Sequence, residues 1–208
     1  MPLAILMRHG EAENNVNRIL VGRHLESHLT SCGRQQASEA ARLIQDIPIK
    51  KIYASPVIRT IETAEIVSKI LGISYDIDER LYEIDLGNLA GMNYEEIIRK
   101  HGNLFLKFYA EENPTTPADY GVESFSSVKE RMTSLLEEIR ENYANENILM
   151  VTHLDPIKAA ISALLHLDPE ALYRWHIRNA SLTILKNEGN LYSLFGVNVM
   201  NIDRYLKD

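Results

Sequence analysis

The sequence predicts an α/β fold, a three-layer α/β/α sandwich with a mostly parallel central sheet. Two short apolar runs, residues 3–7 and 148–152, each end abruptly near a histidine, which is typical of buried parallel strands. Predicted strands and helices alternate along most of the chain, as they do in this class. The turn sequence at residues 187–190 predicts a terminal hairpin, so we expect antiparallel pairing at one edge of the sheet.

The individual elements follow from hydrophobic periodicity and from turn residues. We expect strands at residues 3–7, 51–54, 148–152, 182–186 and 191–196. We expect helices at residues 34–46, 58–71, 94–109, 126–143 and 156–166. Pro56 suits the first position of a helix that begins near Val57, because a missing N–H is harmless there.

The composition is that of a globular chain with enough apolar residues for a real core. Of the 208 residues, 45% are hydrophobic and 25% are charged, and we expect one domain over residues 1–208. The net charge of −7 argues against nucleic acid and anionic membrane surfaces as partners. The single cysteine, Cys32, allows no internal disulfide. With no signal-like amino terminus and no long apolar run, we expect a cytoplasmic protein.

His9 and His153 are the first candidates for catalytic residues. Each follows one of the two apolar runs, and ligands in open α/β sheets bind beyond the carboxyl ends of the strands. For either histidine alone, the first polar residue after a strand is an equally good explanation. Arg8 favours chemistry, because its fork of donors matches phosphate or carboxylate oxygens. A neutral imidazole beside it suits attack on phosphorus, and we expect His9 in a loop that faces solvent.

Two further residues fit an anion site. A side chain at Gly10 would crowd a tetrahedral anion, and the loop needs an unusual backbone conformation there. Arg59 falls in the first turn of the helix predicted at residues 58–71, where the helix dipole favours negative charge. The alternative for Arg59 is a solvated surface arginine.

The chain resembles the histidine phosphatase superfamily, also called the phosphoglycerate mutase-like family. The resemblance is spread in order over nearly the whole chain and implies the phosphoglycerate mutase-like version of the sandwich. The matching residues are Arg8, His9, Gly10, Glu11, Asn15, Gly22, Leu29, Thr30, Gly33, Gln36, Ala37, Ser55, Pro56, Arg59, Thr60, Thr63, Ala64, Leu81, Glu83, Gly87, Gly91, Glu123, Ser124, Arg131, Val151, Thr152 and His153.

The resemblance implies a role for each residue of the site. His9 would be the nucleophile, His153 would be a catalytic residue that clamps the phosphoryl oxygens, and Glu83 would give a proton to the leaving oxygen. Glu83 must then be protonated when the ester bond breaks, so we expect burial to raise its pKa. An ordinary surface glutamate is the alternative. The residues implied to bind phosphate are Arg8, Arg59, Asn15, Gly22 and Leu154.

The resemblance implies catalysis without a metal or a cofactor, on a small phosphorylated metabolite. Two guanidiniums and an imidazolium supply the positive charge that a metal supplies in other phosphoryl transfer sites. After the second histidine, however, most members continue with glycine, whereas this chain has Leu154, Asp155 and Pro156. We expect Asp155 to cap a helix that begins at Pro156, and an aspartate at this place could repel an anion.

Two activities of the family remain open, and a metal-independent phosphomonoesterase with a phosphohistidine intermediate is favoured over a 2,3-bisphosphoglycerate-dependent phosphoglycerate mutase. The mutases hold the substrate carboxylate with a lysine and a pair of arginines. In this chain Tyr94 stands at the lysine position, and the arginine pair would fall near Ala110 and Glu111. The nearby cations that could substitute for this clamp are Arg99, Lys100 and Lys107.

A lid-like insertion is expected around residues 92–125. Its most loop-like part, residues 111–121, contains Pro114 and Pro117 and would overhang the site and select the substrate. A passive surface connection is the alternative. The sequence leaves the oligomeric state open, a homo-oligomer included.

Two other classes of function are weaker. His24 and His28 lie four residues apart and could begin a zinc site, but the chain has no cysteine pair and no His-Glu-x-x-His helix to complete it. A non-catalytic module that binds phosphorylated ligands or regulates a partner is the other class. Such a module has little use for a nucleophile and an acid together.

Overall fold

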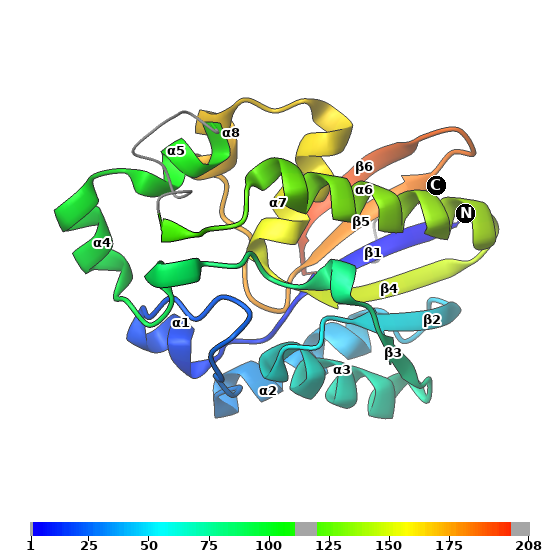
Figure 1. Ribbon diagram of the computed structural model, residues 1–208. Helices are drawn as coiled ribbons and strands as arrows, with labels where there is room; N and C mark the ends of the chain where they lie inside the picture. The colour runs from blue at the N-terminus through cyan, green and yellow to red at the C-terminus, as the bar shows by residue number, and fades with distance from the viewer. Residues whose placement is uncertain (1, 111–119, 201–208) are drawn as a thin grey trace.

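The computed structural model describes residues 2–110 and 120–200 and contains a central mixed sheet (Figure 1). The strand order is β3-β2-β4-β1-β5-β6. The first four strands in this order are parallel, whereas β5 runs antiparallel to β1 and β6 antiparallel to β5. The predicted terminal hairpin and antiparallel edge are therefore confirmed. The strands are β1 (Leu3–Arg8), β2 (Ile49–Ala54), β3 (Tyr75–Ile77), β4 (Asn147–Thr152), β5 (Leu182–Asn187) and β6 (Tyr192–Val199).

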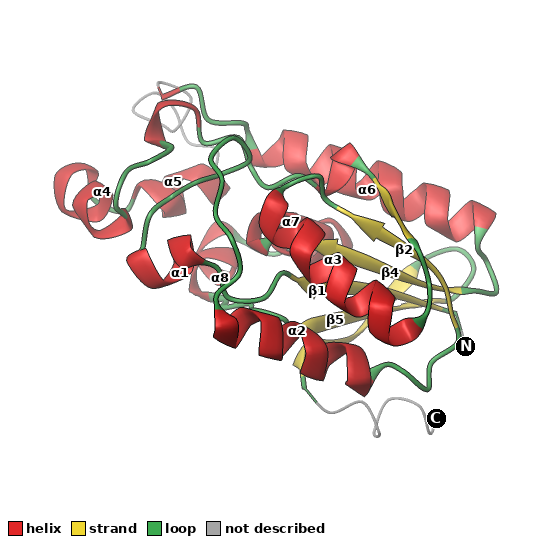
Figure 2. Ribbon diagram, turned by 90° about the horizontal axis from the view of Figure 1, so that it is seen from below, coloured by secondary structure: helices red, strands yellow, loops and turns green. Residues whose placement is uncertain are grey.

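Helices cover both faces of the sheet, so the three-layer sandwich is confirmed. Helices α2 and α3 pack together on one face, and α6 and α7 pack together on the other (Figures 1 and 2). Four shorter α-helices and two 3₁₀ helices, η1 (Glu79–Leu81) and η2 (Gly87–Leu89), also belong to the described part of the chain. The helices are α1 (Glu13–Asn17), α2 (Ser31–Leu43), α3 (Ile58–Leu71), α4 (Tyr94–His101), α5 (Leu104–Ala110), α6 (Phe125–Asn142), α7 (Leu154–Leu165) and α8 (Pro169–Arg174).

Strand β1 lies between β4 and β5, and it is buried on both faces because helices cover the two sides of the sheet. Ile5 and Met7 join the apolar cluster under α2 and α3, while Ala4 and Leu6 join the cluster under α6 and α7. This alternation follows from the two-residue period of a strand. It explains why residues 3–7 read as one continuous apolar run.

The register of the sheet brings the two candidate histidines together. Arg8 is paired with Thr152 where β1 and β4 run parallel, so His9 and His153 leave the sheet at the same edge. The backbone N–H of His9 donates to the carbonyl oxygen of Thr152 at 2.9 Å. Helices α1, α4, α5 and α8 lie beyond this edge, at the left of the molecule in Figure 1.

The prediction of one helix over residues 94–109 is wrong. Gly102 has a φ of +67°, which glycine adopts at little cost, and its N–H donates to the carbonyl of Ile98 at the end of α4. The side chain of Asn103 then accepts from the N–H of Leu106 in the first turn of α5. The chain therefore turns between two short helices.

Other differences concern short elements and helix ends. Strand β3 and helices α1 and α8 were not expected, because three to six residues are too few to show a periodicity. Helix α3 begins after Val57, so Pro56 lies ahead of the helix and not at its first position. Of the expected lid segment, residues 111–121, only Tyr120 and Gly121 belong to the described residues.

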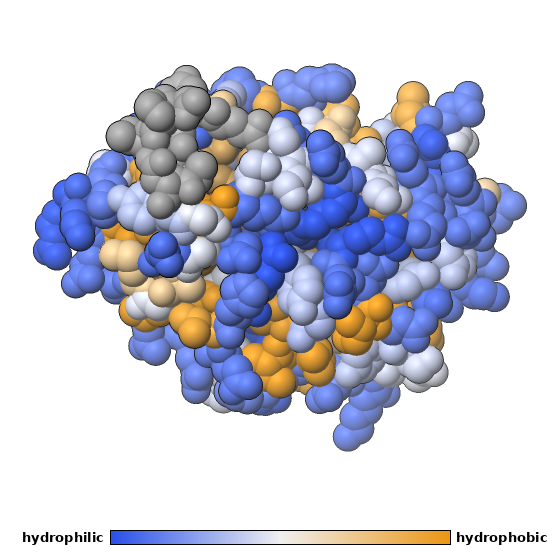
Figure 3. Space-filling model, viewed as in Figure 1, coloured by the Kyte–Doolittle hydropathy of each residue, from blue (hydrophilic) through white to orange (hydrophobic). Residues whose placement is uncertain are grey.

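The surface offers little continuous apolar area on the face drawn in Figure 3, which is mostly hydrophilic with small hydrophobic areas. Large hydrophobic residues that are exposed lie on separate segments, and they include Val16, Leu25, Ile77, Leu165, Leu191 and Met200. Among the described helices, none is long and apolar enough to cross a membrane.

Candidate active site

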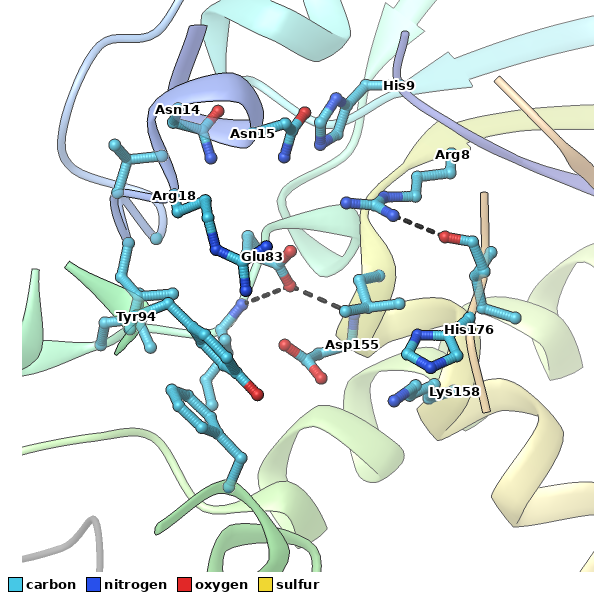
Figure 4. A pocket seen from close by; sticks show the side chains of 18 of the residues that line it. Arg8, His9, Asn14, Asn15, Arg18, Glu83, Tyr94, Asp155, Lys158 and His176 are labelled. Carbon is cyan, nitrogen blue, oxygen red and sulfur yellow. Dashed lines mark hydrogen bonds between the residues drawn. The ribbon is translucent and has the colours of Figure 1, made fainter. Parts of the chain in front are cut away.

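A cavity of about 430 Å³ lies beyond the carboxyl ends of β1 and β4 (Figure 4). Its walls come from β1, from the loops after β1, α1, η1 and α8, and from helices α1, α3, α4, α5, α7 and α8. The structure brings nearly all of the predicted site residues together here. Those that line the cavity are Arg8, His9, Asn15, Gly22, Arg59, Glu83 and Leu154.

His9 is almost fully buried, with 2% of its surface exposed, so the expectation of a solvent-facing loop is wrong. Its Nδ1 lies 2.7 Å from the carbonyl oxygen of Gly10, and its Nε2 accepts a hydrogen bond from Nε of Arg59 at 3.2 Å. Burial and the charges of Arg59 and Arg8 lower the pKa of His9 well below its usual value. A neutral imidazole with its proton on Nδ1 leaves the Nε2 lone pair available for attack.

His153 is fully buried next to His9, with the two ring centroids 5.2 Å apart. Its Nε2 lies 2.8 Å from Oγ of Ser55. Burial, followed by the charge of Arg59, lowers the pKa of His153 well below its usual value. Within the described part of the chain its Nδ1 is buried and has no hydrogen-bond partner, which leaves it able to meet a ligand.

Arg59 and Arg8 place two positive charges at the site. Arg59 is 2% exposed, so the alternative of a surface arginine is wrong, and its Nη2 donates to the carbonyl of Gly22 at 2.9 Å. Gly22 has a φ of +55°, a conformation that suits glycine and turns this carbonyl toward the guanidinium. Burial lowers the pKa of Arg59 to about 10, so it stays charged at neutral pH. Arg8 donates to the carbonyl of Ile177.

Glu83 lies on the cavity wall between η1 (Glu79–Leu81) and η2 (Gly87–Leu89). Its Oε1 accepts from the backbone N–H groups of Ile84 at 3.0 Å and Asp155 at 3.4 Å (Figure 4). Burial, followed by the charge of Asp155, raises the pKa of Glu83 to about 7. This direction agrees with the expectation that burial would raise the pKa. The structure therefore does not support an ordinary surface glutamate.

Asn15 lies on α1 with its amide group held in one orientation. Its Oδ1 accepts from the N–H of Ala12 at 3.0 Å and from Nδ2 of Asn179 at 3.1 Å. Asn179 also donates to the carbonyl of His9 at 3.2 Å. With Oδ1 occupied, the NH₂ group of Asn15 is the part that can serve a ligand. Asn179 was missed by sequence reasoning, because nothing in the surrounding residues distinguishes it.

Gly10 is needed for packing and not for room around an anion. A Cβ at Gly10 would lie 2.3 Å from the carbonyl oxygen of Gly33, and a Cβ at Gly33 would lie 1.9 Å from the carbonyl oxygen of Glu11. The two backbones can touch only because both residues are glycine. This contact fixes the loop that carries His9 against the first turn of α2. The expected unusual conformation is absent, since Gly10 is not among the residues with positive φ in the described part of the chain.

Helix α7 begins one residue after His153, which corrects the prediction of an Asp155 cap. His153 itself is the N-cap residue, with extended backbone at φ −124° and ψ −173°. Asp155 lies in the first turn, where the helix dipole favours a carboxylate. Its Oδ1 accepts from the hydroxyl of Tyr109 at 2.7 Å. Leu154 takes the place of the usual glycine as the first residue of the helix, with its side chain half-buried on the cavity wall.

The two histidines of the weaker zinc hypothesis bind different carboxylates. His24 Nε2 lies 2.9 Å from Asp85, and His28 Nδ1 lies 3.0 Å from Glu62. Among the described residues, no group of three or more His, Cys, Asp or Glu side chains could hold a metal ion. The structure therefore does not bring His24 and His28 together as ligands.

The family model of the histidine phosphatase superfamily (branch 1) matches residues 4–199. The chain belongs to the histidine phosphatase superfamily. Several residues of the resemblance, among them Arg8, His9, Arg59 and Glu83, line one cavity at this sheet edge. The fold agrees as well, because solved phosphatases share it.

Curated relatives of this histidine phosphatase include members with different activities. A 2,3-bisphosphoglycerate-dependent phosphoglycerate mutase of Thermoplasma acidophilum is 32% identical over 99% of this chain and 98% of the relative. Phosphoserine phosphatase 1 of Hydrogenobacter thermophilus is 31% identical over 94% of this chain and 91% of the relative. Membership of the superfamily alone therefore does not choose between hydrolysis and isomerisation.

Solved structures with the same fold include complexes. A phosphoserine phosphatase variant of Entamoeba histolytica in complex with phosphoserine has a TM-score of 0.82 and 28% identity, and the match covers 96% of this chain and 98% of that one. A mycobacterial glucosyl-3-phosphoglycerate phosphatase in complex with VO₃ has a TM-score of 0.83 and 26% identity, with 96% and 100% covered.

The histidine phosphatase described here has no cation at the places that the sequence suggested for a carboxylate clamp. Tyr94 lines the cavity, whereas Arg99, Lys100 and Lys107 do not. Other basic side chains also line the cavity. These residues, missed by sequence reasoning, are Arg18, Lys158 and His176.

Proposed function

We propose that this histidine phosphatase is a phosphomonoesterase that acts on small phosphorylated metabolites through a phosphohistidine intermediate. The observation that carries the proposal is the placement of His9 and Glu83 in one cavity, each in the protonation state that its role needs. His9 is neutral with its lone pair on Nε2, and Glu83 can hold a proton near neutral pH. We also propose that residues 1–208 form one catalytic domain.

In the first step, Nε2 of His9 attacks phosphorus while the bond between phosphorus and the leaving oxygen breaks. Glu83 gives its proton to that oxygen, so the product leaves as a neutral alcohol. The proton of His9 stays on Nδ1 and is donated to the carbonyl oxygen of Gly10, which stabilises the positive charge that the ring acquires. A phosphorylated His9 and an ionised Glu83 remain.

In the second step, Glu83 acts as the base. Its carboxylate takes a proton from water, the water oxygen attacks phosphorus, and the bond from phosphorus to Nε2 of His9 breaks. Inorganic phosphate is released, and both residues return to their starting states. One group with a pKa near 7 can serve both steps, because it is then neither too strong nor too weak an acid.

Fixed positive charge around the phosphoryl group supports catalysis without a metal. Arg8 and Arg59 are charged, and Nη1 of Arg59 is buried with no partner in the described part of the chain. A phosphoryl dianion would also favour a proton on His153, offsetting the burial that keeps its imidazole neutral in the free protein. Asn15 adds a neutral donor. Such preorganised donors stabilise the charge of the transition state.

The experiment that tests this proposal follows product formation with EDTA present. Phosphate release is measured from an aryl phosphate, from a panel of small alkyl phosphates and from 3-phosphoglycerate. Conversion of 3- to 2-phosphoglycerate is measured in parallel, with and without 2,3-bisphosphoglycerate. We expect phosphate release without isomerisation. Activity that is lost with EDTA and restored by a metal would contradict the metal-independent mechanism.

The second candidate function is a 2,3-bisphosphoglycerate-dependent phosphoglycerate mutase. The Thermoplasma relative and three basic side chains that line the same cavity, Arg18, Lys158 and His176, favour it. A phosphorylated His9 would then return its phosphoryl group to a sugar acid and not to water. Isomerisation that is faster than hydrolysis would establish this function in place of the first.

A further inference from the structure

Three polar side chains, those of Lys158, Tyr109 and Asp155, form a series of hydrogen bonds that leads to Glu83. Nζ of Lys158 donates to Oη of Tyr109 at 3.1 Å, and Oη of Tyr109 donates to Oδ1 of Asp155 at 2.7 Å. The backbone N–H of Asp155 then donates to Oε1 of Glu83 at 3.4 Å. Figure 4 shows Asp155 between Glu83 and Lys158. Of these four hydrogen-bonded residues, only Glu83 has a part in the two steps described above.

The burial of Lys158 indicates that this series of hydrogen bonds has a role besides packing. Lys158 is 3% exposed in the middle of α7, among residues that are otherwise mostly apolar. A buried ammonium group is costly unless it is paired and hydrogen-bonded. Here it has the hydroxyl of Tyr109, the face of the same ring at 4.7 Å and the nearby charge of Asp155. A methionine at this place would pack without these partners.

We propose that Asp155 is a positioning residue for the proton donor Glu83, orienting its carboxyl through a backbone N–H and keeping it protonated through a fixed negative charge. Tyr109 and Lys158 hold that negative charge in place. The inference rests on the proposed function, since it takes Glu83 as the group that protonates the leaving oxygen. It also gives a purpose to the Leu154-Asp155-Pro156 sequence, where the family usually has glycine.

Two carboxyl groups on one cavity wall do not ionise independently, because the first charge disfavours the second. Asp155 receives the hydroxyl bond of Tyr109 and faces an ammonium group, so it is the better place for the charge. Among the described residues, only backbone N–H groups donate to Glu83, which is therefore the better place for the proton. The shift in the pKa of Glu83 has the same sense, with burial as the largest cause and Asp155 as the next.

Charged and titratable groups face Glu83 from every side of the cavity. Arg8 on β1 and Arg59 on α3 lower the pKa of Glu83, and Asp155 on α7 raises it. The other groups on the walls are Lys158 on α7, Tyr109 on α5, Tyr94 on α4, Arg18 at the end of α1, His9 and His176. Removal of a negative charge from this set therefore lowers the pKa of Glu83, and removal of a positive charge raises it.

The test is the pH profile of kcat/KM for an alkyl phosphate, with glycerol 2-phosphate as the probe. Asp155→Asn keeps the acceptor for Tyr109 and the backbone N–H but removes the negative charge. We expect the alkaline limb to move to lower pH by about one unit. Lys158→Met removes a positive charge, and we expect its limb to move to higher pH. A merely structural role would not move the two limbs in opposite directions.

Lys107→Met is the matched control, because it removes the same charge from α5 at a residue that does not line the cavity. Its limb should coincide with that of the wild type. Thermal unfolding verifies that each variant is folded. If Asp155→Asn does not fold, the shift of the alkaline limb in Lys158→Met still tests the inference. An unmoved limb in both variants overturns the inference.

Glu83→Gln separates failure of the inference from failure of the proposed function. If this variant loses alkyl phosphate turnover selectively while the limbs of the other variants do not move, only the role of Asp155 is overturned. If it loses alkyl and aryl turnover equally, Glu83 is not the proton donor, and the inference falls with that assignment. The ¹³C NMR titration of the Glu83 carboxyl, in the wild type and in Asp155→Asn, gives the same shift without any assay of activity.

Discussion

The Nδ1 atom of His9 lies 2.7 Å from the carbonyl oxygen of Gly10, and this single contact sets the chemistry of the site. A carbonyl oxygen can only accept, so the ring must carry its proton on Nδ1. The lone pair is then on Nε2, where Arg59 donates to it at 3.2 Å in the free protein. A histidine held in this tautomer is ready to attack phosphorus without losing a proton first.

Replacement of the nucleophile should remove activity. For His9→Ala we expect kcat to fall by roughly 10⁴-fold or more, because no other group can form the covalent intermediate. His28→Ala is the matched control, since His28 is exposed, bound to Glu62 and away from the cavity. Initial rates of phosphate release measure both variants, and thermal unfolding verifies that they are folded. Turnover near that of the wild type in His9→Ala would refute the assignment.

The leaving group should decide how much Glu83 matters. For Glu83→Gln we expect turnover of alkyl phosphates to fall by about 10² to 10⁴-fold, because their leaving oxygens need a proton. Activated aryl phosphates need little protonation and should be affected far less. The comparison of kcat for glycerol 2-phosphate and 4-nitrophenyl phosphate measures this difference. Equal losses on the two substrates would mean that Glu83 only positions other groups.

Stability should depend on pH through Glu83. Its pKa is raised to about 7 in the folded protein, against about 4.3 for a free glutamate, so the folded state holds its proton more tightly. The stabilising effect is complete below about pH 4.3 and is lost as the pH rises through about 7. Glu83→Gln has no such loss.

We therefore expect Glu83→Gln to gain stability relative to the wild type between pH 5 and pH 8, by about 2–3 kcal/mol. Urea unfolding at several pH values in a buffer without phosphate measures the difference. A constant difference between the two proteins over this range would contradict the raised pKa.

The forked shape of Arg59 should matter in addition to its charge. Nε of Arg59 donates to His9, Nη2 donates to Gly22, and Nη1 faces the site without a partner among the described residues. A lysine keeps the charge but cannot make this set of contacts. For Arg59→Lys we expect kcat/KM to fall by roughly 10² to 10³-fold and inhibition by orthovanadate to weaken. Arg34→Lys, at an exposed residue, is the control and should change neither.

The contact between Gly10 and Gly33 should be sensitive to one methyl group. For Gly10→Ala we expect a loss of about 1–3 kcal/mol of stability, because the new Cβ would lie 2.3 Å from a backbone oxygen. Gly72→Ala is the comparison, since a Cβ there meets nothing within 4 Å and only the φ of +70° costs energy. Its loss should be about 1 kcal/mol. Urea unfolding measures both, and only Gly10→Ala should also lower kcat.

The parts of the fold that could be predicted are those with long, regular patterns. Residues 3–7 and 148–152 gave the two central strands, because a strand buried on both faces is apolar throughout. The meeting of His9 and His153 followed from that, since parallel strands end at one edge. The edge strand β3 could not be predicted because it has only three residues. The break between α4 and α5 could not be predicted because it depends on a single glycine, Gly102, with positive φ.

The phosphate end of the site was predictable and the substrate end was not. Arg8 lies at a strand end and Arg59 at a helix start, where sequence patterns are informative, whereas Glu83 was found only through the family resemblance. Lys158 lies within a helix, and its pairing with Tyr109 depends on the packing of α5 against α7. Such contacts join residues 49 positions apart in the sequence, and no local pattern records them. One capping signal was readable and was missed, since Asp168 and Pro169 open α8.

The measurement that tests the central claim most directly is the capture of the intermediate. The protein is mixed with an aryl phosphate for a single turnover, quenched in alkali, where phosphohistidine is stable, and digested for mass spectrometry. We expect one phosphorylated residue, His9, modified on Nε2, and no such peptide in His9→Ala. A protein that turns over without any phosphohistidine, or one that carries the phosphoryl group on His153, would contradict the account.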